Sequence, residues 1–525
     1  MPEEKGRAMH CEFELAKNLY WIGGDDKRLG IFEGHHPVPK GMAYNNYLLL
    51  DEKAVLFDTI DRAVEERFLE TLDYLLADRE LDYIIVHHME PDHSATLETV
   101  AKRNPAAKLV CTATCKKLIG QFFGPELEER TIVVKDGDSL ETGTHTLAFA
   151  LAPMVHWPEV MVTYDVEDKI LFSADAFGSF GALDGRLFDD MYDFENELLD
   201  EMRRYYTNIV GKYGTQVNEL LDKADTLDIE MVCPLHGPIL RDHIADLAAK
   251  YRKWASYEPE DEAVVIAYAS VYGGTRDVAE KLAFKLSDAG IHDLALFDLS
   301  MTDPSYVLSE AFRASNIVLA SVTYNAGVFP KMNELVDCMV EHNLRRRRFS
   351  FIQNGSWGPI AGKKMMESIE RIPEAQIVGD LFTIKSRMTD EQDAELEALA
   401  KSIIDSIRNP EEPVMADVHQ LAPEPTPIVG ATKPMAKPPA KVAVYNSAGI
   451  PVAPGMEGKV KIEEKEPEPV KEKAKTKVVQ IWRCTFCGYQ AEVLKGTDMD
   501  TYVCPVCLKS GPGQFILVRE KEVPL

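Results

Sequence analysis

The segment "YIIVHHMEPDHSATLE", residues 83–98, joins a short apolar run to a dense group of ionisable side chains. Five of them fall within seven positions: His87, His88, Glu90, Asp92 and His93. Such groups beside a buried strand are costly to desolvate unless something neutralises them. The segment therefore predicts a metal site at the end of a strand. Its unexpected member is Glu90, which interrupts a pattern otherwise typical of two-metal hydrolases.

The spacing within this group predicts how its members divide. A strand that ends at His88 places residues two apart on the same side, so we expect His88 and Glu90 to face one metal. The turn that follows would direct Asp92 and His93 toward a second metal. His87 is expected to pack or to support the ligands from behind.

Three further candidate ligands follow apolar runs: His156 in "APMVHWPE", Asp175 in "LFSADAFG" and His236 in "CPLHGPI". Divided between two metals, the whole set gives each metal two imidazoles and at least one carboxylate, because Asp175 can bridge through its two oxygens. This mixture of nitrogen and oxygen ligands is typical of non-haem iron with positions open for a small substrate. A lone histidine such as His236 is more often a packing residue, so the prediction rests on the set.

Changes of pattern along the 525 residues predict about three domains. Residues 1–255 alternate apolar runs with helical stretches, which indicates a layered α/β domain. Residues 256–410 alternate strands and helices in five βα units, which indicates a doubly wound parallel sheet. Residues 411–479 are rich in Pro, Lys and Glu and are expected to form a linker to a small domain at 480–525.

A second site is predicted in the parallel sheet. In "AYASVYGGTRDVAEKLA" a strand enters a loop of hydroxyl and glycine residues and then a helix, an arrangement suited to a phosphate monoester. The loop has neither G-x-G-x-x-G nor G-x-x-x-x-G-K-[ST], which argues against a dinucleotide or a nucleoside triphosphate. Two later strand ends would lie at the same edge, with Tyr324 and Trp357 as candidates to line a planar ring. The candidate residues are Ser270, Val271, Tyr272, Gly273, Gly274, Thr275, Thr323, Tyr324, Asn325, Ala326, Gly327, Asn354, Gly355, Ser356, Trp357 and Gly358.

Four of the nine cysteines form two C-x2-C pairs near the C-terminus: Cys484 with Cys487, and Cys504 with Cys507. Two thiolate pairs with sixteen residues between them predict a tetrahedral metal site. The spacing alone fits a structural zinc as well as a one-electron iron. Beside the predicted two-metal site, a one-electron iron is the more useful occupant, and we favour it.

The charge balance narrows the partners. Lys and Arg number 58 against 86 Asp and Glu, a formal charge of −28, which would repel nucleic acids and anionic lipid. The sequence shows no signal peptide and no window near the roughly 18–20 apolar residues that a membrane-spanning helix needs. The cysteine layout suits a reducing compartment. We therefore expect a cytoplasmic protein that binds neither nucleic acid nor membrane.

The motif H-x-E-x-D-H at residues 88–93, followed by His156, Asp175 and His236, resembles the metallo-β-lactamase-like domain of flavodiiron proteins, in which Glu replaces a His of the hydrolytic motif. The resemblance spans most of residues 10–410 and includes a flavodoxin-like domain that carries FMN. The cysteine pairs resemble a short-spaced rubredoxin. This implies an α/β chain with an αββα metallo-β-lactamase-like domain, a flavodoxin-like doubly wound sheet and a rubredoxin-like four-cysteine domain.

The resemblance also implies an activity: reduction of dioxygen to water or of nitric oxide to nitrous oxide at two non-haem irons. One iron would be held by His88, Glu90, His156 and Asp175, and the other by Asp92, His93, Asp175 and His236. Electrons would pass from a separate NAD(P)H-dependent reductase or another donor to the four-cysteine iron, then to FMN, then to the diiron centre. Family members bring flavin and diiron sites together across a head-to-tail dimer, which implies a homodimer or homotetramer.

Two other classes of protein fit parts of the pattern. A metallo-β-lactamase-type hydrolase with a structural zinc ribbon would contain zinc in the first site. An electron carrier with flavin and rubredoxin-type iron, but without terminal reductase activity, would consume neither gas. For the reductase, His35, His36 and one of Tyr205 or Tyr206 are candidates to donate protons to a bound oxygen species.

Overall fold

The computed structural model describes residues 10–410, 476–484, 490–495, 497–500, 502, 511 and 515–524. The chain separates into two compact units, Met1–Ala416 and Asp417–Leu525. Within the described ranges, every helix is too short or too polar to cross a membrane.

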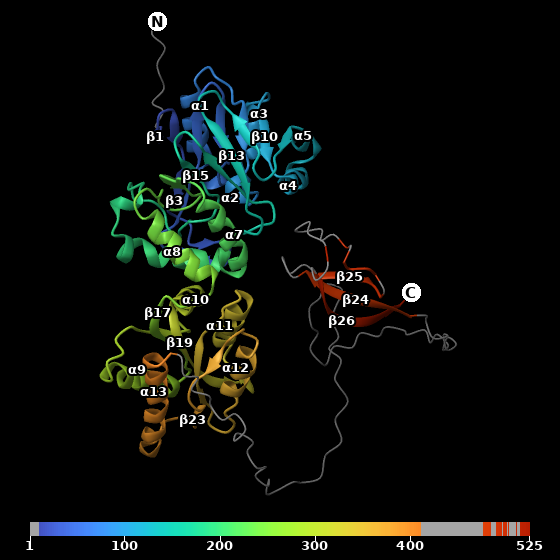
Figure 1. Cartoon of the computed structure of the whole chain (residues 1–525). Helices are drawn as coiled ribbons and strands as arrows, with labels where there is room; N and C mark the ends of the chain where they lie inside the picture. Colours follow the sequence, from blue (N-terminus) through green and yellow to red (C-terminus); the bar gives the residue numbers. More distant parts are fainter. Residues whose placement is uncertain are drawn as a thin grey trace, which may run out of the picture. The chain divides into compact units, whose positions relative to one another are not determined.

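The first half of the larger unit begins with a mixed seven-stranded sheet in the order β1-β2-β7-β8-β9-β10-β11 (Figure 1). These strands are Phe13–Ala16, Leu19–Trp21, Tyr47–Leu50, Ala54–Phe57, Tyr83–Ile85, Lys108–Cys111 and Thr131–Val133. Two separate two-stranded sheets, β3 (Gly24–Asp26) with β6 (Met42–Tyr44) and β4 (Ile31–Phe32) with β5 (His36–Pro37), lie between β2 and β7 in the chain. Alternating side chains of β8 fill two cores, because Val55 and Phe57 point to one face and Leu56 to the other.

A second sheet of five strands packs against the first. Its order is β12 (Ser139–Glu141), β13 (Thr146–Leu151), β14 (Met161–Asp165), β15 (Ile170–Phe172) and β16 (Met231–Cys233). The rings of Phe57 and Phe172, one from each sheet, stack with centroids 3.9 Å apart. The inner faces of the two sheets therefore share one apolar core.

Helices cover the outer faces of both sheets. α1 (Glu65–Leu76), α3 (Leu97–Arg103), α4 (Ala113–Phe123) and α5 (Pro125–Glu129) accompany the first sheet, and α6 (Leu199–Tyr205), α7 (Gly214–Ala224) and α8 (Ile244–Ala255) the second. The amphipathic helix α1, for example, buries Phe68 and Leu72 in the same core as Leu56 of β8. The αββα arrangement expected from the sequence is confirmed.

The second half of the larger unit is a parallel sheet in the order β18-β17-β19-β21-β22. The strands are β17 (Asp261–Ala269), β18 (Leu294–Asp298), β19 (Ala314–Tyr324), β21 (Arg348–Asn354) and β22 (Gln376–Ile377), with β23 (Phe382–Ile384) beside β21 and β20 (Gly327–Val328) antiparallel to β19. From β17 the chain adds β18 on one side of the sheet and then β19, β21 and β22 on the other, so the strand order reverses between β17 and β19. This is the arrangement of a flavodoxin-like sheet, in which the ligand binds at the point of reversal.

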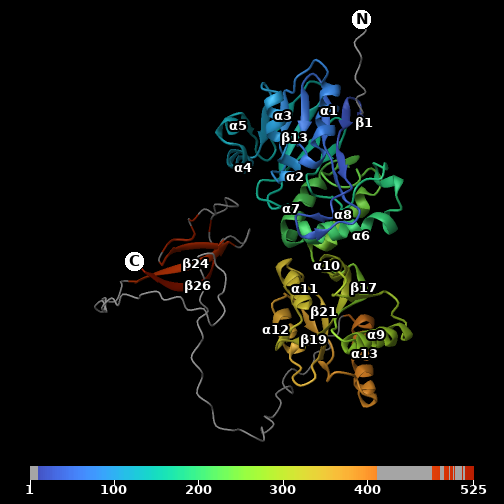
Figure 2. The same ribbon diagram turned by 180° about the vertical axis from the view of Figure 1, so that it is seen from behind.

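Both faces of this sheet are covered (Figures 1 and 2). α9 (Gly274–Asp288) and α13 (Asp393–Arg408) share a core with Val264 and Ile266 of β17. α10 (Pro304–Arg313), α11 (Pro330–Glu341) and α12 (Ala361–Ile369) share the opposite core with Val265 and Ala267. Consecutive residues of β17 thus enter different cores, which explains its continuous apolar run.

The two halves of the larger unit meet at a buried ion cluster around Glu260, which precedes β17. Its carboxylate accepts hydrogen bonds from Arg203 Nε (2.6 Å) and Trp254 Nε1 (2.6 Å) and contacts Lys250 Nζ (2.8 Å). Next to Arg203, the guanidinium of Arg204 binds Ser305 Oγ at the start of α10 and lies over the ring of Tyr306. These contacts link α6 directly to the parallel sheet.

The smaller unit contains a three-stranded antiparallel sheet in the order β25-β24-β26. Its strands are β24 (Thr476–Cys484), β25 (Gln490–Leu494) and β26 (Phe515–Pro524). β24 begins at Thr476, inside the range 411–479 that the sequence assigns to a linker. The rest of that range, 411–475, lies outside the described residues.

We predict that Glu260→Ala destabilises the larger unit by about 3–5 kcal/mol, because Arg203 would remain buried without its carboxylate partner. Urea unfolding followed by tryptophan fluorescence measures the change. Glu258→Ala is the matched control: Glu258 is exposed and pairs with Arg346 at 3.6 Å, so its loss should change stability by no more than about 0.5 kcal/mol. Equal effects of the two substitutions would contradict the account.

Candidate metal centre

Each of the seven candidate ligands lies just beyond a strand of the αββα sandwich. After β9, His88 and Glu90 lie in the connecting loop, and Asp92 and His93 lie in the one-turn helix α2 (Pro91–Ser94). The other three, His156, Asp175 and His236, follow β13, β15 and β16. All seven are buried except Glu90, which is partly exposed.

The local backbone differs from the sequence expectation. β9 ends at Ile85 rather than at His88, and a helix replaces the turn expected after Glu90. The N–H of His87 donates to Asp58 Oδ1 (2.7 Å), so the chain leaves the sheet there. Strand alternation therefore does not orient His88; the loop does.

The first group of ligands converges on two carboxylate oxygens. The Nε2 atoms of His88 and His156 both lie 3.2 Å from Asp175 Oδ2. They lie 3.2 and 3.1 Å from Glu90 Oε2, respectively. Four donor atoms from three strand ends thus surround one point, as the sequence predicts for one metal.

The second group uses the other oxygen of Asp175. His93 Nε2 lies 3.3 Å from Asp175 Oδ1 and 3.3 Å from Asp92 Oδ2. His236 Nε2 lies 3.6 and 3.2 Å from the same two oxygens. Asp175 therefore presents one oxygen to each histidine pair, which is the geometry of a bridging carboxylate.

The polar atoms in this cluster fit metal ions better than they fit one another. Both carboxylate oxygens of Asp92 and of Asp175 are buried without a hydrogen-bond partner among the described residues. The Nε2 atoms of His93 and His236 face each other at 3.0 Å. Buried polar groups are normally paired, so such a convergence of lone pairs indicates a pair of cations.

The electrostatics of the metal-free cluster point the same way. Burial lowers the pKa of His156, but the adjacent carboxylates of Asp175 and Glu90 outweigh it and raise the pKa to about 9. Burial is likewise outweighed at His93, where Asp92 and Asp175 raise the pKa to about 9. The pKa of Asp175 is held well below its usual range, against burial, by the surrounding histidines. Without metal, the cluster holds protons in place of cations.

His87 lies outside the cluster, as expected. Its ring is buried, with Nδ1 2.5 Å from Asp58 Oδ2 and Nε2 2.7 Å from Thr163 Oγ1. Both ring nitrogens are therefore occupied by protein groups. His87 fixes the loop that carries His88 and is not available to a metal.

The four proton-donor candidates differ in position. The Tyr205 ring lies 5.5 Å from that of His236, whereas Tyr206 packs against Tyr251 and Trp254 with its hydroxyl buried and unpaired among the described residues. His36 packs beside Phe180, and its pKa is lowered to about 4 by burial and nearby cations. His35 contacts His36.

Glu33 also borders the centre, although the sequence gave no reason to select it. Burial, together with a contact to Glu90, raises the pKa of Glu33 to about 8. Glu33, His156, Trp157 and Lys212 are among the residues that line a cavity of about 310 Å³. This cavity gives a small molecule a route to the first ligand group.

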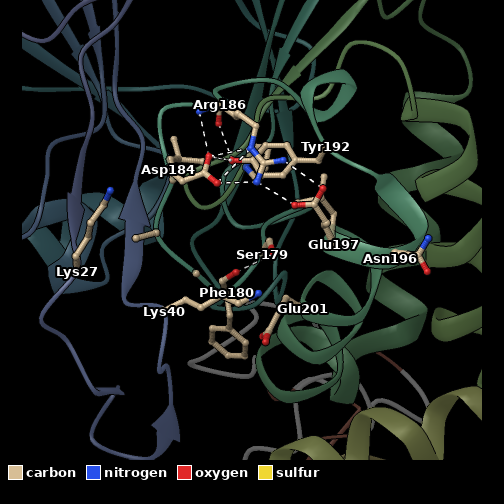
Figure 3. Close-up of a pocket in the computed structure, with 15 residues that line it drawn as sticks. Lys27, Lys40, Ser179, Phe180, Asp184, Arg186, Tyr192, Asn196, Glu197 and Glu201 are labelled. Atoms are coloured by element: carbon tan, nitrogen blue, oxygen red, sulfur yellow. Dashed lines mark hydrogen bonds and ion pairs between the residues drawn. The ribbon is translucent and has the colours of Figure 1, made fainter.

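Two other features do not resemble the metal centre. His145, Asp165 and Asp168 also cluster, but His145 Nδ1 and Asp165 Oδ2 form an ordinary hydrogen bond of 2.8 Å between the residue before β13 and the end of β14. A cavity of about 410 Å³ is shown in Figure 3, where Arg186 is held by acidic side chains against a tyrosine ring. None of the seven candidate ligands is among the residues that line it.

The flavin candidates form one edge of the parallel sheet. Ser270–Gly273 follow β17, Tyr324 ends β19 and is followed by Asn325 and Ala326, and the third group follows β21, which ends at Asn354. Asn354 Nδ2 donates to Thr275 Oγ1 (3.2 Å), and Thr323 Oγ1 accepts from the N–H groups of Ile360 (2.9 Å) and Ala361 (3.2 Å). These bonds tie the three loops together at the carboxyl ends of the strands.

The exposed groups at this edge suit a ligand that has a planar ring system and a phosphate ester. Tyr272 and Trp357 are 97% and 96% exposed, which leaves two aromatic faces open at the strand ends. α9 begins at Gly274, so unpaired N–H groups of a fifteen-residue helix face the loop. Both features fit a flavin mononucleotide.

The structure adds Ser386, which follows β23, to this edge. Ser386 donates its N–H to Asn354 Oδ1 (2.9 Å) and its hydroxyl to Ser356 Oγ (2.7 Å). Its carbonyl would lie 2.1 Å from a Cβ atom added to Gly274. This close approach explains why glycine stands where the flavodoxin-like pattern more often has Ser or Asn.

The four-cysteine site lies largely outside the described residues. Cys487, Cys504 and Cys507 are not described, whereas Cys484 ends β24 and is buried. The tetrahedral site therefore stays a prediction of the sequence.

We predict that metal binding to the metal-free protein tightens as pH rises from 6 to 8. His93 and His156, with pKa values of about 9, are charged in this range, and a metal ligand must be neutral. Each displaced proton should strengthen binding roughly tenfold per pH unit. Chelator competition with Fe(II) under anaerobic conditions at three pH values measures the slope; an affinity independent of pH would contradict the assignment.

Comparisons with known proteins agree with this geometry. A family model described as ODP family beta lactamase matches residues 42–237. The anaerobic nitric oxide reductase flavorubredoxin of Vibrio vulnificus is 31% identical over 354 residues, which cover 65% of this chain and 70% of the relative. That of Salmonella arizonae is 32% identical, with 65% and 72% covered.

Solved structures extend the likeness to both halves of the larger unit. The flavodiiron protein of Giardia intestinalis matches with a TM-score of 0.71 and 25% identity over 76% of this chain and 98% of its own. The rubredoxin oxygen:oxidoreductase of Desulfovibrio gigas matches with a TM-score of 0.71 and 26% identity over 76% and 99%. The sandwich with its seven converging candidate ligands, the flavodoxin-like sheet and these relatives together show that the chain belongs to the flavodiiron family of oxidoreductases.

Proposed function

We propose that this protein reduces dioxygen to water, nitric oxide to nitrous oxide, or both, at two irons held by the seven-residue cluster. The observation that carries the proposal is the division of Asp175, whose two oxygens face two separate histidine pairs while Glu90 completes the first group. Relatives named for nitric oxide and for oxygen reduction support both substrates.

The proposed ligand sets are those inferred from the sequence. His88, Glu90, His156 and Asp175 would hold one iron, and Asp92, His93, Asp175 and His236 the other. When bound, the two irons would supply the redox chemistry that reduces a small gas molecule. Replacing an imidazole by Glu90 adds a hard oxygen donor, which suits iron better than zinc.

The surrounding residues would supply the protons that the reaction consumes. Both gas reductions consume protons, and Glu33 reaches Glu90 from the wall of the 310 Å³ cavity. Its raised pKa keeps Glu33 protonated at neutral pH, so it can deliver a proton toward the first ligand group. Tyr205 is buried with its ring beside that of His236, where it would exclude water from the second ligand group.

FMN would bind at the edge formed by Ser270–Thr275, Thr323–Gly327 and Asn354–Gly358, with Ser386 as a further contact. Hydroxyls and N–H groups at the start of α9 would hold the phosphate. Tyr324 and Trp357 would flank the ring system. The cofactor converts single electrons into the several that either gas requires.

The electron donor is proposed to be a separate protein that reduces the four-cysteine iron, which then passes electrons to FMN. A relative named rubredoxin oxygen:oxidoreductase supports this order. We propose the functional divisions 1–255 for the diiron domain, 256–410 for the FMN domain, 411–479 for the linker and 480–525 for the four-cysteine domain.

We also propose a head-to-tail homodimer, or a homotetramer built from it. The start of β17, at Asp261, adjoins Glu260 and the first half of the unit, whereas the FMN loop follows the far end of the strand at Ala269. That end is roughly 25 Å away at about 3.3 Å per residue. A second chain placed in reverse would bring its FMN edge to this metal centre.

The central test compares two aspartates. Asp175→Asn should remove most bound iron and reduce turnover of both gases by at least about 100-fold, because both metals lose a ligand. Asp168→Asn, in the unrelated His145 cluster, should leave iron content and turnover unchanged. Metal analysis, FMN analysis and anaerobic uptake of each gas are the measurements. Zinc in the wild-type centre would favour a hydrolase, and iron without gas uptake an electron carrier.

A second test addresses the four-cysteine site. Cys487→Ser should abolish the iron–thiolate absorbance and slow turnover with a one-electron donor, while dithionite-reduced protein still consumes gas. Cys11→Ser, which changes a cysteine remote in sequence from the two pairs, serves as the control. Normal turnover of the Cys487 variant with the one-electron donor would mean that the C-terminal domain is structural.

A further inference from the structure

The four histidines of the centre present Nε2 to the cluster, and three of them, His88, His93 and His236, differ in what their Nδ1 atoms contact. His88 Nδ1 lies 2.8 Å from Glu159 Oε1, a buried carboxylate. His236 Nδ1 lies 2.8 Å from the backbone carbonyl of Ala43. His93 Nδ1 is buried without a partner among the described residues. The two ligand groups therefore differ in the partners of their histidine Nδ1 atoms, although their Nε2 atoms face carboxylate oxygens in the same way.

Glu159 is held as a fixed acceptor. Its side chain is fully buried, and Oε1 also accepts the N–H of Met89 (3.0 Å), next to His88 in the chain. Among the described residues, its ion-pair partner is His88. The remaining oxygen, Oε2, is buried without a hydrogen bond in the described part of the chain. The negative charge of Glu159 is thus directed at His88.

The backbone of Glu159 is fixed by a different element. Thr112 Oγ1 donates to the carbonyl of Glu159 (3.0 Å) and accepts the N–H of Cys115 (3.1 Å). Thr112 is the N-cap of α4, so one hydroxyl joins the start of that helix to the loop that carries both His156 and Glu159. The carboxylate is therefore positioned by the sandwich itself and not by the metal.

A carboxylate behind a ligating imidazole fixes its tautomer and makes it a stronger donor. A backbone carbonyl does so less, because it carries no net charge. We infer that Glu159 is a positioning residue that makes the two iron sites inequivalent: through His88 it favours the more oxidised state at the iron of the first group, so that the His93–His236 iron is reduced first. This inference rests on the diiron centre proposed above.

The inference extends to the division of labour between the sites. The first group has the carboxylate of Glu90 and one oxygen of the shared Asp175, and the charge of Glu159 adds to them. The second group has Asp92 and the shared Asp175 without such support. The more weakly supported iron is the easier one to reduce, and it is therefore the expected first acceptor of an electron from FMN.

The test is Glu159→Gln in the full-length protein loaded with iron and FMN. Glutamine keeps an acceptor oxygen for His88 and Met89 but removes the charge. We expect the variant still to bind both irons. The affinity for the iron of the first group should fall roughly 10–100-fold. In a redox titration followed by Mössbauer and EPR spectroscopy, the quadrupole splitting of the first-group iron should change and its reduction potential should rise. The interval between the two reduction steps should narrow.

Two further variants make the result decisive. Asp165→Asn removes the charge from a buried carboxylate–histidine pair of the same 2.8 Å length that lies outside the centre, and it should leave both potentials unchanged. Thr112→Val removes the anchor of Glu159 and should shift the same iron in the same direction by a smaller amount; it provides the readout if Glu159→Gln does not fold. Unchanged spectra and potentials in the folded Glu159 or Thr112 variant overturn the inference.

The same experiment separates this inference from the proposed function. If the wild-type protein binds no iron pair, the proposed function fails. If the wild-type protein binds two irons and reduces gas, but its two iron sites titrate identically and Glu159→Gln changes neither, the function stands and the inference fails.

Discussion

The structure depends on the convergence of buried carboxylates and imidazoles around Asp175. Each of its oxygens faces a separate histidine pair, and neither has a hydrogen-bond partner among the described residues. Burying such groups without cations costs several kcal/mol for each charge. Two metal ions held by this cluster, as proposed above, would offset this cost, and their candidate ligands come from loops of both sheets of the sandwich. The fold of the first half and its metal centre are therefore parts of one stabilising arrangement.

The same principle organises the rest of the larger unit. Glu260 carries a buried charge that Arg203, Lys250 and Trp254 satisfy, and this cluster fixes α6 and α8 against the start of β17. α6 also carries Tyr205 to the wall of the metal centre. The flavodoxin-like sheet is thus attached by its strand starts, which leaves the opposite edge, with its exposed Tyr272 and Trp357, open for a flavin and its partners.

Much of this could be predicted from the sequence because the ligand types and their positions after apolar runs are local signals. H-x-E-x-D-H, His156, Asp175 and His236 identified the cluster, and the regular βα alternation identified the parallel sheet. The physical reason given for the positions of His88 and Glu90, strand alternation, was wrong, because β9 ends at Ile85 and a loop orients His88. Glu159 lies 71 residues from His88 in the chain, so no sequence window contains the pair.

Other supporting residues escaped prediction for the same reason. Glu33 approaches Glu90 from a hairpin far away in sequence, and Ser386 reaches Asn354 across neighbouring strands. The nearby Ser386 carbonyl leaves no room for a side chain at Gly274, and no local sequence pattern shows this contact. A motif reveals groups that must carry the chemistry, whereas the residues that position those groups are defined by tertiary contacts.

The most direct test of the central claim is anomalous diffraction at the iron and zinc absorption edges from crystals of the purified protein. The account predicts two iron peaks about 3.5–4 Å apart, one on each side of the Asp175 carboxylate. A single peak, or two peaks that appear at the zinc edge and not at the iron edge, would contradict it.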